Sequence, residues 1–164
     1  MLGYVARTLP LLVRARLRKS QRLVSRLERR VALSEVDYNL HMNQAVYAQV
    51  GELGRTDWIL GVGAWDRWRA DGINPVVAEQ RIIYRREMKP RQRYAVDTRA
   101  TGMDGRLLCL DSHLIVGDRV HAKLEVKLIF VGPNGVLSVE AAEAACEGLV
   151  TDALAVNAWV TKPS

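Results

Sequence analysis

The chain has 164 residues, of which 49% are hydrophobic and 26% are charged. This length is enough for one compact domain and too short for two ordinary ones, and the composition excludes a disordered chain or a body embedded in a membrane. The two cysteines, Cys109 and Cys146, form no Cys-x-x-Cys pair, which argues against a disulfide scaffold or a zinc site and indicates a reducing compartment. We therefore expect a soluble, cytoplasmic protein.

The net charge of +6 is concentrated at the start of the chain. Residues 1–30 hold nine Lys and Arg against one Glu, a net charge of +8, which leaves −2 for the other 134 residues. The body of the protein therefore gives no electrostatic reason to expect nucleic-acid binding. Residues 1–28 are predicted to form a basic amphipathic segment, whose charges follow its apolar residues, unlike those of a secretory signal. Two interpretations stay open: a helix packed on the domain, or peripheral contact with an anionic membrane surface.

A short strand is predicted over residues 29–37 and a long helix over residues 43–60. Gly51 and Gly54 lie inside this helix. Because glycine costs a helix roughly 1 kcal/mol relative to alanine, two of them predict close approach by neighbouring backbone, as in a helix buried against a sheet. The apolar stripe of the helix is formed by Val46, Val50, Leu53 and Leu60.

Residues 64–70 are predicted to form a second, short helix that ends at the turn Asp71-Gly72. The following part of the chain alternates apolar and polar residues with period two, which is typical of strands with one buried and one wet face. A break at Lys89-Pro90 and hairpin signals at Asp104-Gly105 and Gly117-Asp118 divide it into four strands of an antiparallel meander. The residues expected on the buried face are Val76, Ala78, Ile82, Tyr84 and Met88, then Tyr94, Val96, Thr98 and Ala100, then Leu108, Leu110, Leu114 and Val116, then Val120, Ala122, Leu124, Val126, Leu128 and Phe130.

The order of these elements predicts the fold. A strand, a long helix with small residues and then four long antiparallel strands is the order of the hot-dog fold, where a sheet assembled from later strands covers the helix. We expect an α+β domain over residues 29–131, with a long central helix wrapped by a curled antiparallel sheet of five or six strands. Residues 132–164 are expected to form a peripheral tail with a helix over residues 138–148.

Polar residues concentrate just before the long helix, in the sequence SEVDYNLHMNQAVY from Ser34 to Tyr47. This stretch resembles the signature of the 4-hydroxybenzoyl-CoA thioesterase-like hot-dog family, with an acid, one residue, an Asp, then His-x-Asn after an interval, and a Tyr on the helix. Glu52-Leu53-Gly54-Arg55 resembles the family's Glu-x-x-Arg segment. The resemblance covers about 100 of the 164 residues. Glu35 departs from the pattern, because the family more often has Asp there, and the basic segment is similar to that of a small subgroup with an N-terminal extension.

The resemblance implies an acyl-CoA thioesterase in which Asp37 is the catalytic carboxylate. Thioester hydrolysis supports this assignment independently, because it needs a nucleophile or general base beside the carbonyl carbon and donors for the developing oxyanion. The backbone N–H groups near Asn43, Gln44 and Ala45, at the start of the predicted helix, supply such donors, and the helix dipole adds positive potential. No metal or dissociable cofactor is expected, since coenzyme A enters only as part of the substrate.

Other residues are candidates for substrate contact or for catalysis. His41, Asn43 and Tyr47 are predicted to shape the loop or orient the substrate, and loop hydrogen bonding is the structural alternative for both Asp37 and His41. Glu52 is a second catalytic candidate, because another branch of hot-dog thioesterases uses a carboxylate from the helix. Its alternative role is an ion pair with Arg55 or with a partner subunit.

Two side-chain clusters have a structural and a functional interpretation. Trp58, together with Trp65 and Trp68, either packs at the helix end or lines an acyl tunnel. Arg85 and Arg86 either contact the phosphates of coenzyme A or form a solvated charge cluster. His113 and His121 alternate with apolar residues and are expected at the surface.

The leading hypothesis is a thioester hydrolase that acts on acyl-CoA and, as the resemblance implies, forms a homodimer or a tetramer. The first alternative is a hot-dog protein that binds acyl-CoA, acyl carrier protein or lipid without hydrolysis. The second is a membrane-surface protein whose basic segment is the working part. A hot-dog dehydratase is a weaker alternative, because His41 belongs to the loop motif and not to the helix. The acyl chain and the choice between coenzyme A and acyl carrier protein are left open.

Overall fold

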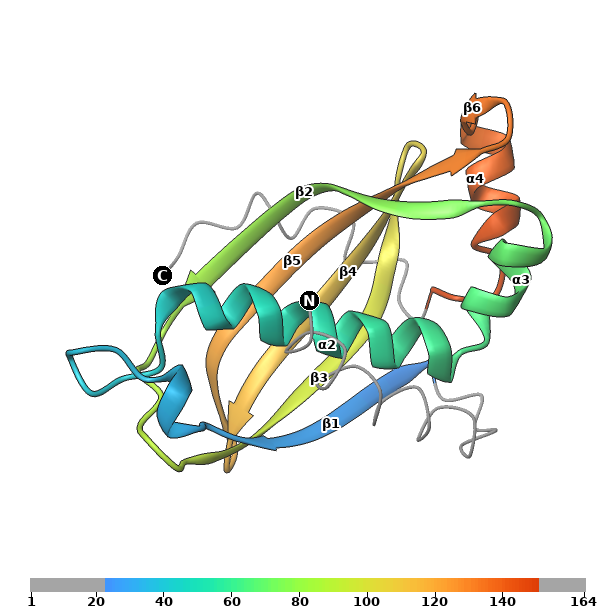
Figure 1. Ribbon diagram of the computed structural model, residues 1–164. Coiled ribbons are helices and arrows are strands. Elements are labelled where there is room, and N and C mark those ends of the chain that lie inside the picture. The colour runs from blue at the N-terminus through green and yellow to red at the C-terminus, as the bar shows by residue number, and fades with distance from the viewer. Residues whose placement is uncertain (1–22, 151–164) are drawn as a thin grey trace.

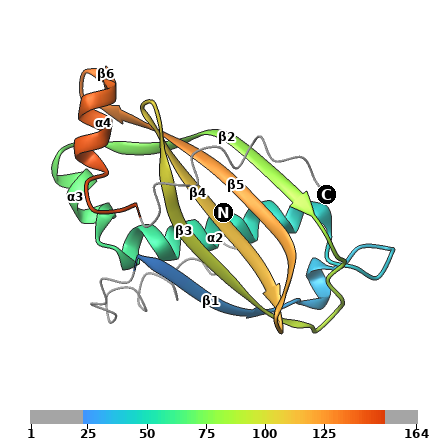
Figure 2. The same cartoon turned by 180° about the vertical axis from the view of Figure 1, so that it is seen from behind.

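The computed structural model describes residues 23–150, so the predictions for residues 1–22 and 151–164 lie outside the described residues. A long helix, α2 (Gln44–Gly61), lies across the concave face of a curled antiparallel sheet of six strands (Figures 1 and 2). The strands run in the order β1-β3-β4-β5-β2, with β6 added to the end of β5. The predicted α+β hot-dog fold is confirmed. None of the described helices is long and apolar enough to cross a membrane.

The elements follow one another along the chain with short connections. They are β1 (Val24–Arg30), the 3-10 helix η1 (Leu33–Glu35), α2, α3 (Ala64–Ala70), β2 (Asn74–Tyr84), β3 (Arg93–Asp104), β4 (Leu107–Val116), β5 (Arg119–Gly132), β6 (Gly135–Val136) and α4 (Val139–Ala145). The predicted long helix, the second helix and the four later strands are all present. The predicted four-stranded meander is wrong, because only β3, β4 and β5 are consecutive neighbours, and β2 pairs with β5 instead of β3. The residues of β3, β4 and β5 predicted on the inner face are buried, except Val116 and Val120 near the hairpin, which are partly exposed. Val116 still packs against the core cluster that includes the helix.

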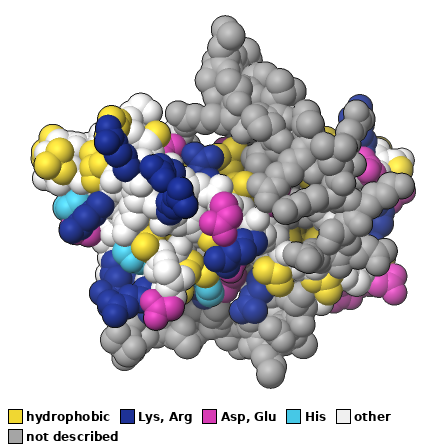
Figure 3. Space-filling view, turned by 90° about the horizontal axis from the view of Figure 1, so that it is seen from below, with side chains coloured by type: hydrophobic (Ala, Val, Ile, Leu, Met, Phe, Trp, Pro, Cys, Tyr) yellow, Lys and Arg dark blue, Asp and Glu magenta, His cyan; other side chains and the backbone are white. Residues whose placement is uncertain are grey.

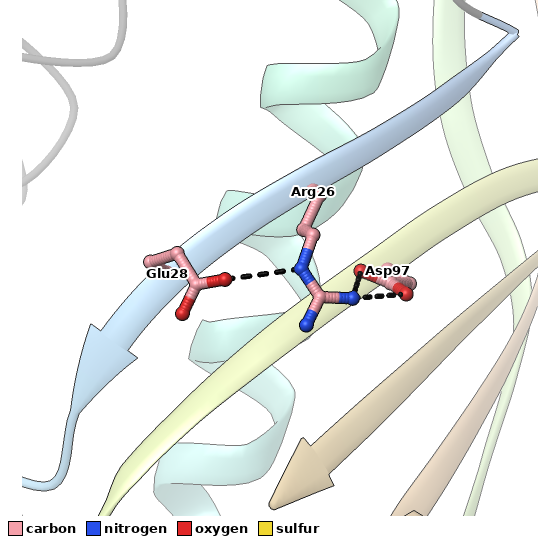
Figure 4. Close-up of polar contacts among 3 residues, drawn as sticks. All are labelled: Arg26, Glu28 and Asp97. Atoms are coloured by element: carbon pink, nitrogen blue, oxygen red, sulfur yellow. Dashed lines mark hydrogen bonds and ion pairs between the residues drawn. The ribbon is translucent and has the colours of Figure 1, made fainter. Parts of the chain in front are cut away.

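The first strand is not where the sequence pattern placed it. β1 spans Val24–Arg30 instead of residues 29–37, so it begins inside the stretch assigned to the basic segment. Leu27 is buried at its centre, whereas Arg26 and Glu28 face outward, and Arg26 bonds both to Glu28 and to Asp97 on β3 (Figure 4). The strand was not recognised from the sequence, because these outward-facing charged residues continue the run of basic residues that precedes it.

β1 is attached to the far half of α2 by two hydrogen bonds. Ser25 Oγ donates to Asp57 Oδ2 at 2.6 Å, and the indole nitrogen of Trp58 donates to the carbonyl of Leu23 at 2.9 Å. Asp57 and Trp58 are both buried. A buried carboxylate is tolerated only with such a partner, so Ser25 and Asp57 specify where β1 lies along the helix.

The helix approaches the sheet closely at its two glycines. A Cβ atom at Gly54 would lie 2.7 Å from Thr98 Oγ1 and 2.8 Å from Val96 Cγ1, and one at Gly51 would overlap the side chain of Leu124. The close approach predicted at the glycines is present, but side chains of the sheet make it, and not the neighbouring backbone that was expected. Val46, Val50 and Leu53 are buried against the sheet as predicted, whereas Leu60, at the exposed end of the helix, is only partly buried.

The residues predicted to be buried on β2 need correction. Val76, Ala78 and Tyr84 are exposed instead of buried. Val77 and Glu79 are exposed as well, so both faces of this part of the edge strand are open, and a register shift between Val77 and Glu79 interrupts its pairing with β5. Met88 is fully buried as predicted, but β2 already ends at Tyr84 and Met88 belongs to the connection that follows. β2 pairs only with β5 and is one edge of the sheet.

The side chains on the convex face of the sheet are less exposed to solvent than predicted. Glu125 of β5 is 1% exposed and lies opposite Asp111 of β4, and Lys123 bridges the two carboxylates at 2.8 and 3.0 Å. Two carboxylates on directly opposed positions would repel without such a cation. His113, predicted at the surface, is partly buried, and burial lowers its pKa, with Nε2 unbonded among the described residues.

The C-terminal helix is also not peripheral. Ala142, Ala145 and Cys146 belong to a second core cluster around Trp58, Trp68 and Phe130. The Trp68 indole donates to the carbonyl of Ala145 at 2.8 Å. Ala142 and Ala145 are the buried residues of the helix, whereas Ala141 is exposed. The sequence pattern missed this contact because the buried side chains of the helix are small.

Close packing at Gly54 predicts a large effect of one methyl group. Gly54→Ala should lower the free energy of unfolding by about 1–3 kcal/mol, because β-branched side chains fixed on β3 cannot move aside. Gly61→Ala is the control: nothing lies within 4 Å of its Cβ position, so it should be neutral or stabilising by up to about 1 kcal/mol. Urea denaturation followed by circular dichroism measures both. Equal stability of the two variants would contradict the close approach.

Candidate functional site

Asp37 lies in a closed loop between η1 and α2. Val36 and Met42 form an isolated antiparallel bridge, and inside it Asp37 N donates to the carbonyl of His41 at 2.9 Å. Leu40 adopts a positive φ of 61°, which lets the chain reverse within the loop. Because opposite positions of an antiparallel pair project to the same side, Asp37 and His41 are neighbours at the neck of this loop.

The Asp37 carboxylate is partly engaged in local structure. Its Oδ1 accepts the backbone N–H of Asn39 at 2.9 Å, which is the bond of an Asx-turn. The loop role considered from the sequence is therefore present. No hydrogen bond from a described residue reaches the second oxygen, Oδ2, and the side chain is only partly buried, so one carboxylate oxygen can still take part in chemistry.

The N-terminus of α2 offers fewer free donors than the sequence suggested. Asn43 is the N-cap, and its side chain accepts Ala45 N at 2.8 Å. Asn43 N donates to the carbonyl of Glu35, also at 2.8 Å. Two of the three predicted oxyanion donors are therefore already engaged. Among the described residues no acceptor is recorded for Gln44 N, which makes it the donor best placed to meet a ligand oxygen at the positive end of the helix.

A buried carboxylate holds the base of the loop. Glu35 is 4% exposed and accepts Arg29 Nη2 at 3.2 Å and Ala32 N at 2.9 Å. Arg29 in turn donates from Nε to the hydroxyl of Tyr94 at 3.1 Å. Burying a charge is tolerated when it is paired and hydrogen-bonded in this way. Glu35 is thus the anchor that ties the loop to β1 and β3.

Aromatic residues line the same end of the helix. The rings of Tyr47 and Tyr84 meet edge to face with centroids 5.0 Å apart, and Gln44 hydrogen-bonds to Tyr84. Burial, followed by the neighbouring tyrosines and the charges of Asp37 and Glu87, raises the pKa of Tyr47 to about 12. Tyr47 therefore keeps its proton at physiological pH, and both carboxylates lie within electrostatic reach of its hydroxyl.

One member of the site was missed by sequence reasoning. The predicted strand was expected to reach Met88, and its alternation would put Glu87 on the solvent face, but β2 ends at Tyr84 and the chain then turns towards the loop. There the carboxylate Oε2 lies 2.7 Å from His41 Nε2. No sequence signal identifies Glu87, because its position depends on where the edge strand ends.

The remaining predicted site residues lie elsewhere. Glu52 is partly buried on α2, eight residues after Gln44 and so about 12 Å further along the helix axis. Trp58 is fully buried in the second core cluster, which favours its packing role, and Trp65 is 40% exposed and does not join Trp58 and Trp68 as predicted.

Exposed cations border the loop. Arg85 and Arg86 have exposed side chains, and their backbone N–H groups both donate to the carbonyl of His121. Lys and Arg side chains gather on one half of the face in Figure 3, interspersed with a few Asp and Glu. Among residues 23–150, no group of three or more His, Cys, Asp or Glu side chains is arranged to hold a metal ion.

Comparison with known proteins places this architecture in a family. The profile of the thioesterase-like superfamily matches residues 31–148, and the chain belongs to this superfamily. Its structure resembles that of the probable thioesterase YbaW from Escherichia coli, with a TM-score of 0.70 and 19% identity over 77% of this chain and 98% of that one.

Two further solved structures are similar. The DHNA-CoA thioesterase from Staphylococcus aureus has a TM-score of 0.61 and 14% identity over 77% of this chain and 92% of that chain. A hypothetical protein from Staphylococcus aureus, solved in complex with CoA, has a TM-score of 0.60 and 13% identity over 86% of this chain and 94% of that chain. At these identities the likeness concerns the fold.

The raised pKa of Tyr47 gives a direct prediction. In protein labelled with ¹³C at the tyrosine ζ carbon, the Tyr47 resonance, assigned by its loss in Tyr47→Phe, should stay that of the protonated phenol through pH 10 and titrate near pH 12. The cause is burial, which disfavours the phenolate, reinforced by nearby negative charge. A midpoint at the ordinary value near 10 would show that the hydroxyl is open to solvent.

Proposed function

We propose that this protein hydrolyses acyl-CoA thioesters, with Asp37 as the catalytic carboxylate and the N-terminus of α2 as the oxyanion site. The observation that carries the proposal is that Asp37 has a carboxylate oxygen without a hydrogen bond, in the loop that leads directly into α2, where Gln44 N–H has no acceptor among the described residues. The superfamily and the CoA thioesterase and CoA complex among the similar structures support the substrate class.

The reaction requires little beyond these groups. The Asp37 carboxylate removes a proton from a water molecule, whose oxygen adds to the thioester carbonyl carbon. The carbonyl electrons move to its oxygen, which accepts a hydrogen bond from Gln44 N–H and is stabilised by the helix dipole. Collapse of this intermediate breaks the carbon–sulfur bond, and the thiolate of coenzyme A takes back the proton. Direct attack by the carboxylate through an acyl-enzyme anhydride is the alternative route from the same residue.

Surface charge favours an anionic leaving group. Exposed Arg85 and Arg86 follow Tyr84 directly and so lie at the same end of the molecule as the loop. Guanidinium groups bind phosphate oxygens in bidentate geometry, and coenzyme A carries a diphosphate and a 3′-phosphate. We assign these two side chains to the nucleotide part of the substrate.

The edge strand β2 supports a homodimer. β2 is paired on one side only, and it exposes Val76 at 47% and Val77 at 42%. An exposed apolar edge strand is a surface on which a second strand adds. Pairing of β2 with its copy would extend the sheet across two subunits, in line with the dimer that the family resemblance implies.

Binding without hydrolysis is the second candidate function. The Asx-turn at Asp37 favours it, since this bond gives the carboxylate a structural role that needs no chemistry. An acyl-CoA or acyl carrier protein ligand would then occupy the same end of the helix. The two functions differ in turnover and not in binding.

Thiol release from short, medium, long and aromatic acyl-CoAs tests the catalytic residue. Asp37→Asn should lower kcat by roughly a hundredfold or more, the scale expected for removing a catalytic acid or base. Asparagine keeps an oxygen for the Asn39 N–H, so the loop is preserved. Asp118→Asn, at a fully exposed turn carboxylate, is the control and should retain activity.

The outcomes separate the alternatives. Loss of activity in Glu52→Gln alone would move the catalytic role to the helix carboxylate. A wild type that binds acyl-CoA in calorimetry but releases no thiol across the panel would establish the binding function instead.

Subunit association is tested at the two sheet edges. Val77→Lys should convert a dimer to a monomer in light scattering coupled to size exclusion, because a charged side chain on the edge opposes strand pairing. Val24→Lys changes a valine of nearly equal exposure, 43% against 42%, on the opposite edge strand β1 and should leave the dimer intact. Dissociation by Val24→Lys alone would place the interface at β1.

A further inference from the structure

We propose that Glu87 is a positioning residue for His41: it fixes the imidazole orientation and tautomer and so presents His41 Nδ1 as an acceptor beside Asp37. This inference rests on the proposed hydrolase function and adds a residue to it. The observation behind it is the 2.7 Å contact between His41 Nε2 and Glu87 Oε2. A carboxylate only accepts hydrogen bonds, so Nε2 must carry the proton. In the neutral ring Nδ1 is then the nitrogen with the lone pair.

Glu87 is held more firmly than an ordinary surface carboxylate. Arg85 N and Arg86 N donate to the carbonyl of His121 at 2.9 and 3.0 Å, and His121 Nδ1 lies 2.9 Å from the carbonyl of Glu87. The backbone of the segment that carries Glu87 is therefore attached to the start of β5 through His121, which limits where the Glu87 side chain can begin.

The other end of the pair is fixed as well. Met42 N donates to the carbonyl of Met88 at 2.8 Å, and Met88 is fully buried. This bond joins the residue after His41 directly to the residue after Glu87. The segment at His41 and the segment at Glu87 are thus joined by a backbone bond as well as by the side-chain contact. Such double attachment holds an imidazole in one orientation.

The pair also lies beside the proposed catalytic carboxylate. Asp37 N bonds to the carbonyl of His41, and the charges of Asp37 and Glu87 both act on the Tyr47 hydroxyl. An imidazole whose far nitrogen is oriented by a carboxylate is the arrangement that serine hydrolases use to keep a histidine in the working tautomer. Here Nδ1 would accept a hydrogen bond from the attacking water or from a substrate N–H group.

A role in stability does not account for the pair. His41 and Glu87 have 40% and 48% of their side-chain surface exposed, and ion pairs with such exposure contribute little to folding. Lys89 Nζ, 3.6 Å from Glu87 Oε1, gives the same carboxylate a second, looser partner. Comparing the two partners therefore separates positioning of His41 from a general charge effect.

The experiment combines nitrogen NMR with steady-state kinetics. Long-range ¹H–¹⁵N spectra of wild type at pH 8, assigned by loss of the signal in His41→Gln, should show His41 in the Nε2–H form. In Glu87→Ala the two tautomers should become mixed. Glu87→Ala should also lower kcat on the order of 10-fold, as loss of a group that orients a site histidine does, with KM changed less than about twofold. Lys89→Gln is the matched control and should change neither readout.

A double-mutant cycle decides whether Glu87 acts through His41. The double variant His41→Gln/Glu87→Ala should be no slower than His41→Gln alone. If Glu87 acts only through His41, its removal has no further effect once the histidine is gone. Three results would each overturn the proposal. They are an unchanged His41 tautomer in Glu87→Ala, additive losses of kcat in the cycle, and a loss of kcat in Lys89→Gln equal to that in Glu87→Ala. A wild type without turnover would overturn the proposed function, and the tautomer spectra would then decide the positioning of His41 by themselves.

Discussion

The close approach of α2 to the sheet at Gly51 and Gly54 is the constraint on which the rest of this structure depends. With no Cβ at these positions, Leu124 and the β3 side chains reach the helix backbone. A helix packed so closely cannot rotate or slide by a fraction of a turn without a steric clash. Its N-terminus therefore has a fixed position relative to the strands, and a site that uses backbone N–H groups needs such a fixed position.

The loop before the helix is fixed by a different set of interactions. Glu35 is buried and bonded to Arg29 and Ala32, and its carbonyl accepts Asn43 N. The same residue thus connects β1, the loop and the helix cap. Capping also determines which donors remain, because Asn43 engages Ala45 N and leaves Gln44 N. Stability and binding share one helix terminus here, and the hydrogen bonds of the cap define what a ligand can reach.

Sequence patterns predicted the parts of the fold that are periodic. The helix-facing residues of β3 to β5 recur with period two because this face contacts the helix, and α2 shows its apolar stripe for the same reason. β1 was displaced in the prediction because Arg26 and Glu28 continue a basic run. In the structure the whole strand pairs with β3, Leu27 is buried and Ser25 bonds to Asp57. Asp37, His41 and Asn43 were identifiable as a group because they are close in sequence. Glu87 was not, since its contact with His41 arises from where β2 ends and from bonds to His121, which only the assembled sheet determines.

The edge strand β2 connects subunit association to the site. Its exposed apolar residues lie near its start, while Tyr84 at its end packs on Tyr47 and precedes the segment that carries Arg85, Arg86 and Glu87. A strand paired on one side only is freer to move than one paired on both. Pairing of β2 with a second copy would therefore restrain the aromatic residue beside the helix N-terminus, the arginines assigned to the nucleotide and the carboxylate that holds His41. In the proposed dimer, this pairing would therefore do more than bury apolar surface: it would order the segment on which three parts of the proposed site depend.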